Sequence, residues 1–350
     1  MCYTNSQKKG TRGADMEIDF VVTWVDGNDT AWQEKKRNVG NASEFRTKTD
    51  DRDERYRDWD NLQYWFRGVE QFAPWIRKIH FVTCGHLPKW LNTEHPKLHI
   101  VKHEDFIPAE FLPTFNSHSI EWNFHRIPGL SEEFVYFNDD MYLLNKLSPE
   151  DFFVGKRPVD MLALQPDVAN TDDTVMPYIY LNNAMLLAKY FKKYENMKRQ
   201  PGAYFYIGYP PKYFFYNLLE TAFPRFTGFY TVHGPSPLKK STYEKLWELE
   251  RDLLTEVCNH PFRHKDDVNQ YVLREYQKLS GDFVPGNVQR LCSYYDIGNN
   301  NRALTETIRK QKSPIVCIND SNHEINFEKA KKELNEALEF RLWKRSSFEK

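Results

Sequence analysis

The segment EFVYFNDDMYLL, residues 133–144, joins a short apolar run to two adjacent carboxylates and then becomes apolar again. Residues 134–137 are β-branched or aromatic, which predicts a buried strand that ends at Asn138, Asp139 and Asp140. The carboxyl ends of strands are where open α/β sheets bind ligands. Adjacent carboxylates in an apolar segment repel each other, and a bound cation offsets that cost. The segment therefore predicts a site for Mg²⁺ or Mn²⁺ carrying a phosphate, with two turn aspartates as the alternative.

Other predicted strands also end at polar or acidic residues. IDFVVTWV, residues 18–25, is almost continuously apolar, as expected of a strand buried on both faces, and it ends at Asp26 and Gly27. PIVCIND, residues 314–320, predicts a short strand with an Asn-Asp end. Further strands are expected at residues 79–84, 98–102 and 159–164.

The helices expected from apolar spacing lie between and after these strands. One helix should start at Asp60 as its N-cap and end before Pro74. The others are expected in residues 85–96, 118–127, 182–194, 242–258, 268–279 and 324–343. Residues 38–58 predict a long surface loop able to fold over a ligand, and residues 233–241 a turn-rich entry to a helix. The order of elements predicts an α/β fold with a mostly parallel, Rossmann-like sheet flanked by helices and a helix-rich C-terminal part.

Composition limits the function and the compartment. The 350 residues carry 48 Lys and Arg against 49 Asp and Glu, a net charge of -1, so no overall field favours nucleic acid as a partner. Five cysteines without a CxxC spacing predict free, mostly buried thiols of a reducing compartment. The polar residues 1–16 predict a disordered N-terminus, and the chain shows neither a signal peptide nor an apolar run of membrane-spanning length. We therefore expect a cytosolic protein.

Longer motifs resemble a known family. IDFVVTWVDGND, then APWIRKIHFVTCGHLPKWLN and LPTFNSHSIEWNFHRIPGLSEEFVYFNDDMYL with SPEDFF, then HGPSPLKKS with FRHKDDVNQY, and finally VCINDS resemble the four conserved regions of the Stealth family, in order. These regions lie near residues 17–30, 56–153, 228–275 and 314–321, which predicts a catalytic domain over 17–321 followed by a charged helix in 322–350. One departure is Cys84-Gly85-His86, where the family more often has an acidic residue and Gly.

The resemblance implies an activity. The Stealth family includes bacterial capsular polysaccharide phosphotransferases and the lysosomal-enzyme N-acetylglucosamine-1-phosphotransferase of animals. It implies a GT-A-like core and transfer of a sugar 1-phosphate from a UDP-sugar, UDP-GlcNAc or another UDP-hexose, to a glycan hydroxyl, with release of UMP and with a divalent metal. Peripheral association with capsule-assembly machinery at the inner face of the membrane is expected as well.

The residues suit that chemistry, since phosphoryl transfer depends on positioning and charge neutralisation. Asp139 and Asp140 would hold the metal, with Asp140 the stronger candidate. Arg263 offers a planar fork for the transferred phosphate. His233 is the candidate base, because a histidine with an ordinary pKa of about 6.5 has a neutral fraction that accepts a hydroxyl proton. Asp26, Gly27 and Asn138 would border the donor.

Each assignment has a structural alternative. Arg263 would otherwise be a solvated residue at a helix start, and His233 a turn residue. Asp267 is either a further metal ligand or a first-turn acid, and Arg126 reaches either a phosphate or a structural carboxylate. Asn116, Ser117 and His118 are assigned to substrate binding, and their alternative is a helix N-cap.

Two rival functions also remain open. A GT-A-like glycosyltransferase would use the same nucleotide-sugar apparatus but form a glycoside and release UDP. A carbohydrate-binding protein would keep the fold without turnover.

Overall fold

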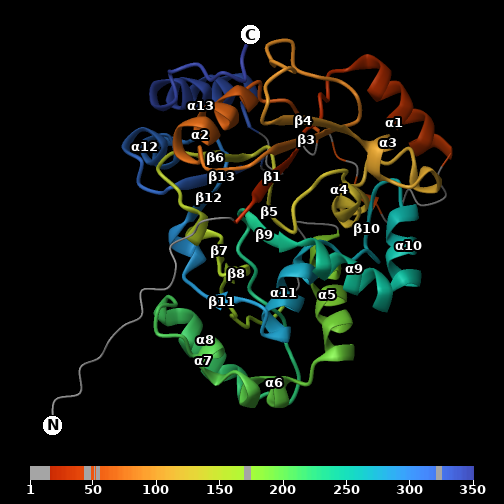
Figure 1. The fold of residues 1–350 in the computed structure, drawn as a ribbon, viewed down its shortest axis with the longest axis vertical. Coiled ribbons are helices and arrows are strands. Elements are labelled where there is room, and N and C mark those ends of the chain that lie inside the picture. Colours follow the sequence, from red (N-terminus) through yellow and green to blue (C-terminus); the bar gives the residue numbers. More distant parts are fainter. Residues whose placement is uncertain (1–15, 43–48, 51, 53–55, 169–174, 321–324) are drawn as a thin grey trace.

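A five-stranded sheet forms the centre of the computed structural model, which describes residues 16–42, 49–50, 52, 56–168, 175–320 and 325–350 (Figure 1). Its order is β4 (Leu98–Lys102), β3 (Ile79–Thr83), β1 (Ile18–Thr23), β5 (Glu133–Phe137) and β9 (Ser236–Lys239). The first four strands are parallel and β9 is antiparallel to β5. The predicted mostly parallel sheet is confirmed, and the predicted disordered N-terminus, 1–16, falls outside the described residues except for Met16.

The register of this sheet decides which side chains meet. Val22 of β1 pairs with Phe137 of β5, so the residues after both strands emerge at one edge. Ser236, the first residue of β9, pairs with Tyr136 of β5. Because β9 runs the opposite way, the chain just before it, including His233, lies at the same edge. The prediction of a turn-rich segment over 233–241 is therefore wrong from Ser236 onward, since the edge of β5 supplies the hydrogen bonds for a strand.

A second sheet meets the first at the two aspartates. Its order is β12 (Cys292–Asp296), β13 (Ile315–Asn319) and β6 (Met141–Leu143), with β13 parallel to β12 and antiparallel to β6. The backbone N–H of Ile318 donates to the carbonyl oxygen of Asp140 at 2.9 Å. The strand predicted over 314–320 is confirmed, whereas β12 is not predicted by the sequence.

Two smaller pairings complete the strands. β2 (Thr49–Asp50) pairs with β10 (Arg263–His264), and β8 (Arg157–Asp160) lies between β7 (Phe153–Val154) and β11 (Val284–Pro285). The strand expected at 159–164 therefore begins and ends earlier.

The helices cover both faces of the central sheet and fill the lower end of Figure 1. The α-helices are α1 (Thr30–Ala42), α2 (Leu62–Phe72), α3 (His103–Phe106), α4 (Ser117–Trp122), α5 (Met176–Tyr190), α6 (Lys193–Arg199), α7 (Pro201–Tyr204), α8 (Pro211–Glu220), α9 (Lys240–Leu249), α10 (Arg251–Asn259), α11 (Tyr271–Ser280), α12 (Arg302–Lys310) and α13 (Phe327–Arg341). Short 3₁₀ helices lie at Ala109–Phe111, Phe124–Arg126, Pro149–Asp151 and Val288–Arg290. No helix in these described ranges has the length and the apolar run needed to cross a membrane.

Several helix predictions need correction. Residues 38–42 belong to α1 and not to a loop, because Trp32 of this polar helix packs against Phe115 and Asp29 accepts a hydrogen bond from its first turn. Asp60 is not the N-cap of α2, since its φ is 52° and the cap position belongs to Asn61.

Other helix boundaries differ from expectation. The helix expected at 182–194 starts at Met176 and a new helix starts at Lys193, while the helix expected at 242–258 breaks at Glu250. Residues 85–96 form turns and no helix.

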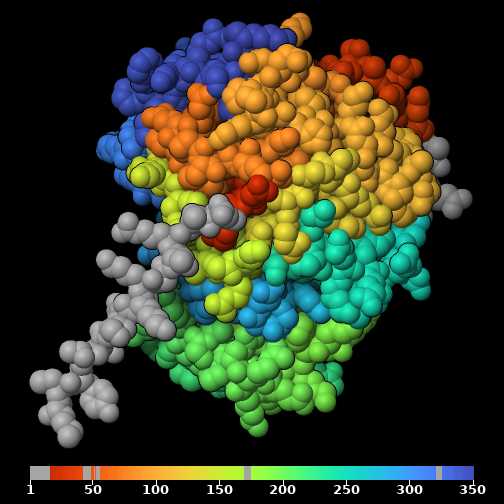
Figure 2. All heavy atoms as spheres, in the orientation of Figure 1, coloured from red at the N-terminus to blue at the C-terminus, as the bar shows by residue number. Residues whose placement is uncertain are grey.

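The core lies on both faces of the central sheet because its strands alternate between them. Phe20 and Val22 of β1 face a cluster that contains side chains of α2 and α13, whereas Val21 faces a cluster that contains side chains of α4, α9, α10 and α11. The charged C-terminal helix α13 thus contributes to the core through its buried side chains Leu334 and Leu338. Figure 2 shows the red to orange N-terminal segments and the blue C-terminal residues in the upper part of the molecule, and residues near 200 at the lower end.

Candidate active site

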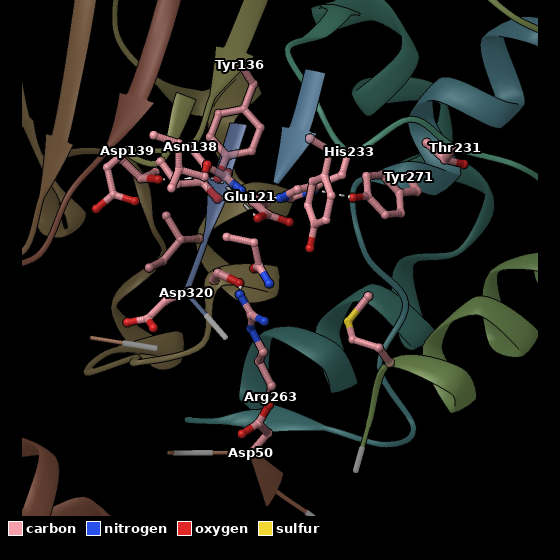
Figure 3. Close-up of a pocket in the computed structure, with 18 of the residues that line it drawn as sticks. Asp50, Glu121, Tyr136, Asn138, Asp139, Thr231, His233, Arg263, Tyr271 and Asp320 are labelled. Carbon is pink, nitrogen blue, oxygen red and sulfur yellow. Dashed lines mark hydrogen bonds and ion pairs between the residues drawn. The ribbon is translucent and has the colours of Figure 1, made fainter. Parts of the chain in front are cut away.

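A cavity of about 1110 Å³ opens at the edge of the sheet where β1 and β5 end. Its volume slightly exceeds the usual range for ligand pockets, roughly 300–1,000 Å³. The side chains that the sequence singled out and that line it are Ser117, Asn138, Asp139, Asp140, His233 and Arg263. Figure 3 labels Asn138, Asp139, His233 and Arg263 among them. The structure therefore brings together residues that lie more than a hundred positions apart.

The acidic part of the cavity holds three carboxylates. Burial and the nearby charges of Asp140 and Asp58 raise the pKa of Asp139 to about 7. Burial, Asp60 and Asp26 likewise raise the pKa of Asp58. Within the described chain, the buried Oδ1 atom of Asp140 receives no hydrogen bond. This arrangement is costly without a cation, because like charges share a site with little solvent.

The donor atoms fit a hard divalent cation. Asp139 and Asp140 offer carboxylate oxygens, which Mg²⁺ and Mn²⁺ prefer. The Oδ2 atom of Asp140 lies 3.5 Å from the Sγ atom of Cys317, and burial together with Asp140 raises the pKa of that thiol well above its usual range. In the metal-free site, Cys317 is therefore a protonated donor to the carboxylate. The described residues fit the predicted class of metal, with Asp139 and Asp140 as the groups that would hold it.

His233 lies between an acid and a phenol. Its Nδ1 atom is 2.8 Å from the hydroxyl oxygen of Tyr271, and its Nε2 atom is 3.7 Å from Oδ2 of Asp140. Burial raises the pKa of Tyr271 well above its usual range, so the phenol stays protonated. In the tautomer whose Nδ1–H donates to Tyr271, the lone pair of Nε2 is free to accept a proton.

Arg263 approaches the cavity from the side opposite the sheet (Figure 3). Its strand β10 pairs with β2 in the segment before Tyr56, and its Nε donates to the hydroxyl of Ser117 at 3.1 Å. Among the residues that the structure describes, no carboxylate forms an ion pair with Arg263. The two terminal nitrogens of the guanidinium are therefore available to an anion, in the fork geometry that suits a phosphate.

Comparison with known proteins agrees with the motifs. Stealth protein CR1, conserved region 1, matches residues 16–44, and Stealth protein CR2, conserved region 2, matches residues 55–161. The capsular polysaccharide phosphotransferase WcwK of Streptococcus pneumoniae is 38% identical over 95% of this chain and 99% of its own length. The chain belongs to the Stealth family. The resemblance that the motifs carry is thereby confirmed.

Other relatives of this Stealth protein have similar names. The exopolysaccharide phosphotransferase cps2G of Lactiplantibacillus plantarum is 36% identical over 95% of this chain and 96% of its own. The receptor polysaccharide phosphotransferase WefC of Streptococcus gordonii is 36% identical over 95% and 99%. Among solved structures, the galactosyltransferase LgtC with donor and acceptor sugar analogs is 11% identical over 91% of this chain and 95% of that chain, with a TM-score of 0.39, too low to carry an argument.

Three of the predicted site residues of this Stealth protein form a buried cluster outside the cavity lining. Oδ2 of Asp267 lies 2.9 Å from Nδ1 of His118 and 3.1 Å from the amide nitrogen of Asn116, and Oδ1 lies 2.6 Å from Nδ1 of His260. The backbone N–H of His264 also donates to Asp267. Burial opposes ionisation, but the hydrogen bonds from His118 and His260 lower the pKa of Asp267 to about 2.

This cluster, Asn116, His118, His260 and Asp267, holds the start of α4 against β10. Asn116 is the N-cap of α4, with its side chain accepting from the N–H of His118, as the structural alternative predicts. The cluster therefore positions Ser117 and Arg263. The structure does not bring Asp267 to Asp139 and Asp140, so it supports neither a shared metal nor substrate contact by Asn116 and His118.

The remaining predicted residues lie beside the cavity or away from it. Arg126 lies on the surface with its guanidinium 4.9 Å from the ring centre of Trp247, and it lines no part of the cavity. The N–H of Asp26 donates to Nε2 of His86 at 2.7 Å. At Gly27, an added Cβ would lie 1.8 Å from the carbonyl oxygen of Tyr56. Gly27 thus lets the backbone of Tyr56, which lines the cavity, come close.

Several cavity residues are missing from the sequence-based assignments. Tyr271, Glu121 and Asp320 line the cavity although no role was predicted for them, and all three lie within motifs that carry the family resemblance. Asp58 lies in the segment predicted as a loop over a ligand. The motifs were therefore a usable signal for all but Asp58, but they do not tell which side chain of each motif faces the cavity.

Proposed function

We propose that this protein transfers a sugar 1-phosphate from a UDP-sugar to a hydroxyl group of a surface glycan and releases UMP. The proposal rests chiefly on one observation: Asp140, His233 and Arg263 line the same cavity. The names of the relatives, phosphotransferases of capsular and exopolysaccharides, support the reaction class. The volume of about 1110 Å³ suits a nucleotide sugar together with part of an acceptor.

The proposed reaction is a single displacement at the β-phosphorus of the UDP-sugar. The acceptor oxygen forms a bond to this phosphorus, and the bond from the phosphorus to the oxygen that bridges both phosphates breaks. UMP leaves with the bridging oxygen, and the sugar phosphate becomes a phosphodiester. Nε2 of His233 accepts the proton of the acceptor hydroxyl, and Tyr271 holds the imidazole through Nδ1.

Binding of the transferred phosphate and neutralisation of its charge complete the proposed mechanism. Arg263, held at Nε by Ser117, binds the transferred phosphate with its two terminal nitrogens. A divalent ion bound by Asp139 and Asp140 would supply charge neutralisation at the diphosphate. Asn138, Asp26 and Gly27 border the donor in this proposal, with Gly27 acting through the backbone of Tyr56 that approaches it.

The proposal also includes a donor, an acceptor and a cellular compartment. We infer UDP-GlcNAc or another UDP-hexose as donor and a capsule glycan as acceptor. The reducing cytosol is the proposed compartment, which agrees with the four described cysteines, Cys84, Cys258, Cys292 and Cys317, all of which are free thiols.

Product analysis tests the proposal against both rivals. The purified protein is incubated with UDP-hexoses, Mg²⁺ or Mn²⁺ and capsule fragments, and the nucleotides are separated by chromatography while phosphorus NMR follows the glycan. UMP together with a phosphodiester is expected. UDP together with a glycoside would identify a glycosyltransferase instead. Glycan binding without nucleotide release under any of these conditions would identify a carbohydrate-binding protein.

A further inference from the structure

Helix α8 has its polar side inward and its apolar side outward. Asn217 and Glu220 are buried, together with Tyr213. The outward residues are Phe214, Phe215, Leu218 and Leu219, and Phe215 and Leu219 are 60% and 65% exposed. A surface helix of a water-soluble domain normally has the opposite arrangement. The outer face of α8 is therefore apolar, where a solvent-exposed helix face is normally polar.

The helix is firmly held in this orientation. The side chain of Asn217 donates to the carbonyl oxygens of Leu162 and Tyr204 and accepts from the N–H of Leu164. The buried Lys193 donates to the carbonyl and the carboxylate of Glu220, the last residue of α8. Rotating α8 to bury its apolar face would break these buried bonds, which is costly.

Neighbouring segments extend the apolar surface. Ile207, between α7 and α8, is 96% exposed, and Phe223, just after α8, is 48% exposed. Tyr194 of α6 is also exposed, and its hydroxyl donates to the carbonyl of Thr221 beside the end of α8. Figure 2 shows these segments as the lower end of the molecule. We call this surface the α8 face: Tyr194, Ile207, Phe214, Phe215, Leu218, Leu219 and Phe223.

The charge around the α8 face is positive. Residues 189–225 contain seven Lys or Arg residues and two acidic residues, in a chain whose net charge is -1. Lys193 and Glu220 form a buried pair, and Lys189 and Lys192 pair with Glu250 and Glu195. Four exposed basic side chains, Lys198, Arg199, Lys212 and Arg225, have no ion pair among the described residues. Lys212 at the start of α8 and Arg225 after its end flank the apolar residues. Exposed aromatic and aliphatic residues with flanking basic residues match an anionic membrane surface.

We propose that the α8 face binds the surface of a membrane that contains anionic lipids. A second copy of the chain is the main alternative occupant. A two-fold interface would place the same patch of both copies against each other, and so bring two sets of basic side chains together. An anionic lipid surface accepts both the apolar residues and the positive charge.

Membrane contact at this face would also lie close to the cavity. The ring centre of Tyr213, on the inner side of α8, is 4.4 Å from that of Tyr230, and Tyr230 lines the cavity. Helix α8 and the contact between Tyr213 and Tyr230 therefore separate the α8 face from the cavity lining, and this closeness suits acceptors held at a membrane.

Vesicle sedimentation tests the inference and needs no turnover. The purified protein is mixed with vesicles of phosphatidylcholine alone or of phosphatidylcholine and phosphatidylglycerol in equal parts. We expect binding to the anionic vesicles and at least about tenfold weaker binding of the double variant Phe215→Ser, Leu219→Ser. Lys212→Gln with Arg225→Gln should weaken binding to anionic vesicles only, and this variant keeps the apolar face intact should the serine variant fail to fold.

The matched control is Phe340→Ser with Trp343→Ser. These residues are 67% and 71% exposed but lie at the opposite end, on and after α13, and this variant should bind vesicles like the wild type. Thermal melting should be the same for all variants, since each changed side chain is exposed. Failure of the wild type to bind anionic vesicles, or equal loss in the control, would overturn the inference. A different result would also overturn it: light scattering shows a dimer of the wild type, only the Phe215→Ser, Leu219→Ser variant abolishes that dimer, and the wild type does not bind vesicles.

Discussion

The Nδ1 atom of His233 lies 2.8 Å from the hydroxyl oxygen of Tyr271, although the two residues come from different elements. His233 precedes the edge strand β9, and Tyr271 is the first residue of α11. The contact fixes one nitrogen of the imidazole and leaves the other 3.7 Å from Oδ2 of Asp140. A histidine held in this way can accept a proton at a defined place.

This relationship predicts how His233 and Tyr271 variants fail. A general base contributes about 10²- to 10⁴-fold, so His233→Ala should lose that much in kcat with nearly unchanged donor binding. Tyr271→Phe keeps the ring but loses the hydroxyl, and kcat should fall by roughly tenfold. Tyr190→Phe is the control, because that hydroxyl bonds Glu250 on the surface. The measurement is UMP release with the UDP-sugar varied. If His233→Ala kept its kcat and only bound the donor more weakly, the general base would have to be another residue.

Arg263 should affect both binding and rate. Arg263→Ala should lower kcat and donor affinity together, because the guanidinium meets the phosphate before and during transfer. Arg263→Lys should restore little, since a point charge lacks the fork. Arg126→Ala, on a guanidinium that lies over Trp247 outside the cavity, should keep wild-type kinetics. Donor titration and steady-state kinetics check this, and full rescue by lysine would argue against a two-pronged contact.

The aspartate pair should bind a metal at little cost to the fold. Chelation and Asp140→Asn should each abolish transfer. In chelator, Asp140→Asn should melt within a few degrees of the wild type, because removing one carboxylate relieves repulsion with Asp139. Added Mn²⁺ should raise the melting temperature of the wild type and not of the variant. Full activity in excess chelator would exclude a metal role, and a large loss of stability would indicate a structural pair.

Gly27 should tolerate no side chain. In Gly27→Ala the new Cβ would lie 1.8 Å from the carbonyl oxygen of Tyr56, so the Tyr56 segment has to move away from the cavity. Because Tyr56 lines the cavity, any displacement of its backbone should change the cavity wall, so we expect weaker donor binding and a lower melting temperature. Gly202→Ala is the control, because a Cβ there meets nothing within 4 Å. Isothermal titration with UDP-sugar measures donor binding, and thermal melting measures stability. Equal donor affinity and equal melting temperature of the Gly27→Ala and Gly202→Ala variants would disprove a clash between the new Cβ and Tyr56.

Asp267 should make stability depend on acid pH. Its folded-state pKa, about 2, lies below its ordinary 3.8, so its contribution is complete above about pH 4 and is lost as the pH falls toward 2. A shift of this size is worth roughly 2 kcal/mol. Asp267→Asn should therefore be less stable than the wild type at pH 7, and the difference should shrink between pH 4 and 2. Urea unfolding across this range provides the measurement, and a constant difference would contradict the assignment.

Parts of the fold and of the site were predictable for identifiable reasons. The parallel strands of the central sheet were predicted because apolar runs such as residues 18–23 and 134–137 have few structures other than a buried strand available to them. Asp139, Asp140, His233 and Arg263 were singled out, and all four line the cavity. Helix α1 was missed at residues 38–42 because its polar sequence has a weak apolar face, and packing of Trp32 on Phe115 stabilises it.

By itself, the sequence determined the mostly parallel sheet, the family and the metal-suited aspartates at the end of β5, because these depend on local patterns and on motifs. Only the tertiary structure decided which polar side chains share the cavity. His118 and Asp267 lie in motifs as specific as those of His233 and Arg263, yet they form a buried cluster behind it. The physical reason is that decisive neighbours of a carboxylate or an imidazole come from distant chain segments, as with Asp267 and His118, which are 149 residues apart. The antiparallel edge strand β9 and the β2–β10 pairing set those neighbours, and no local pattern encodes them.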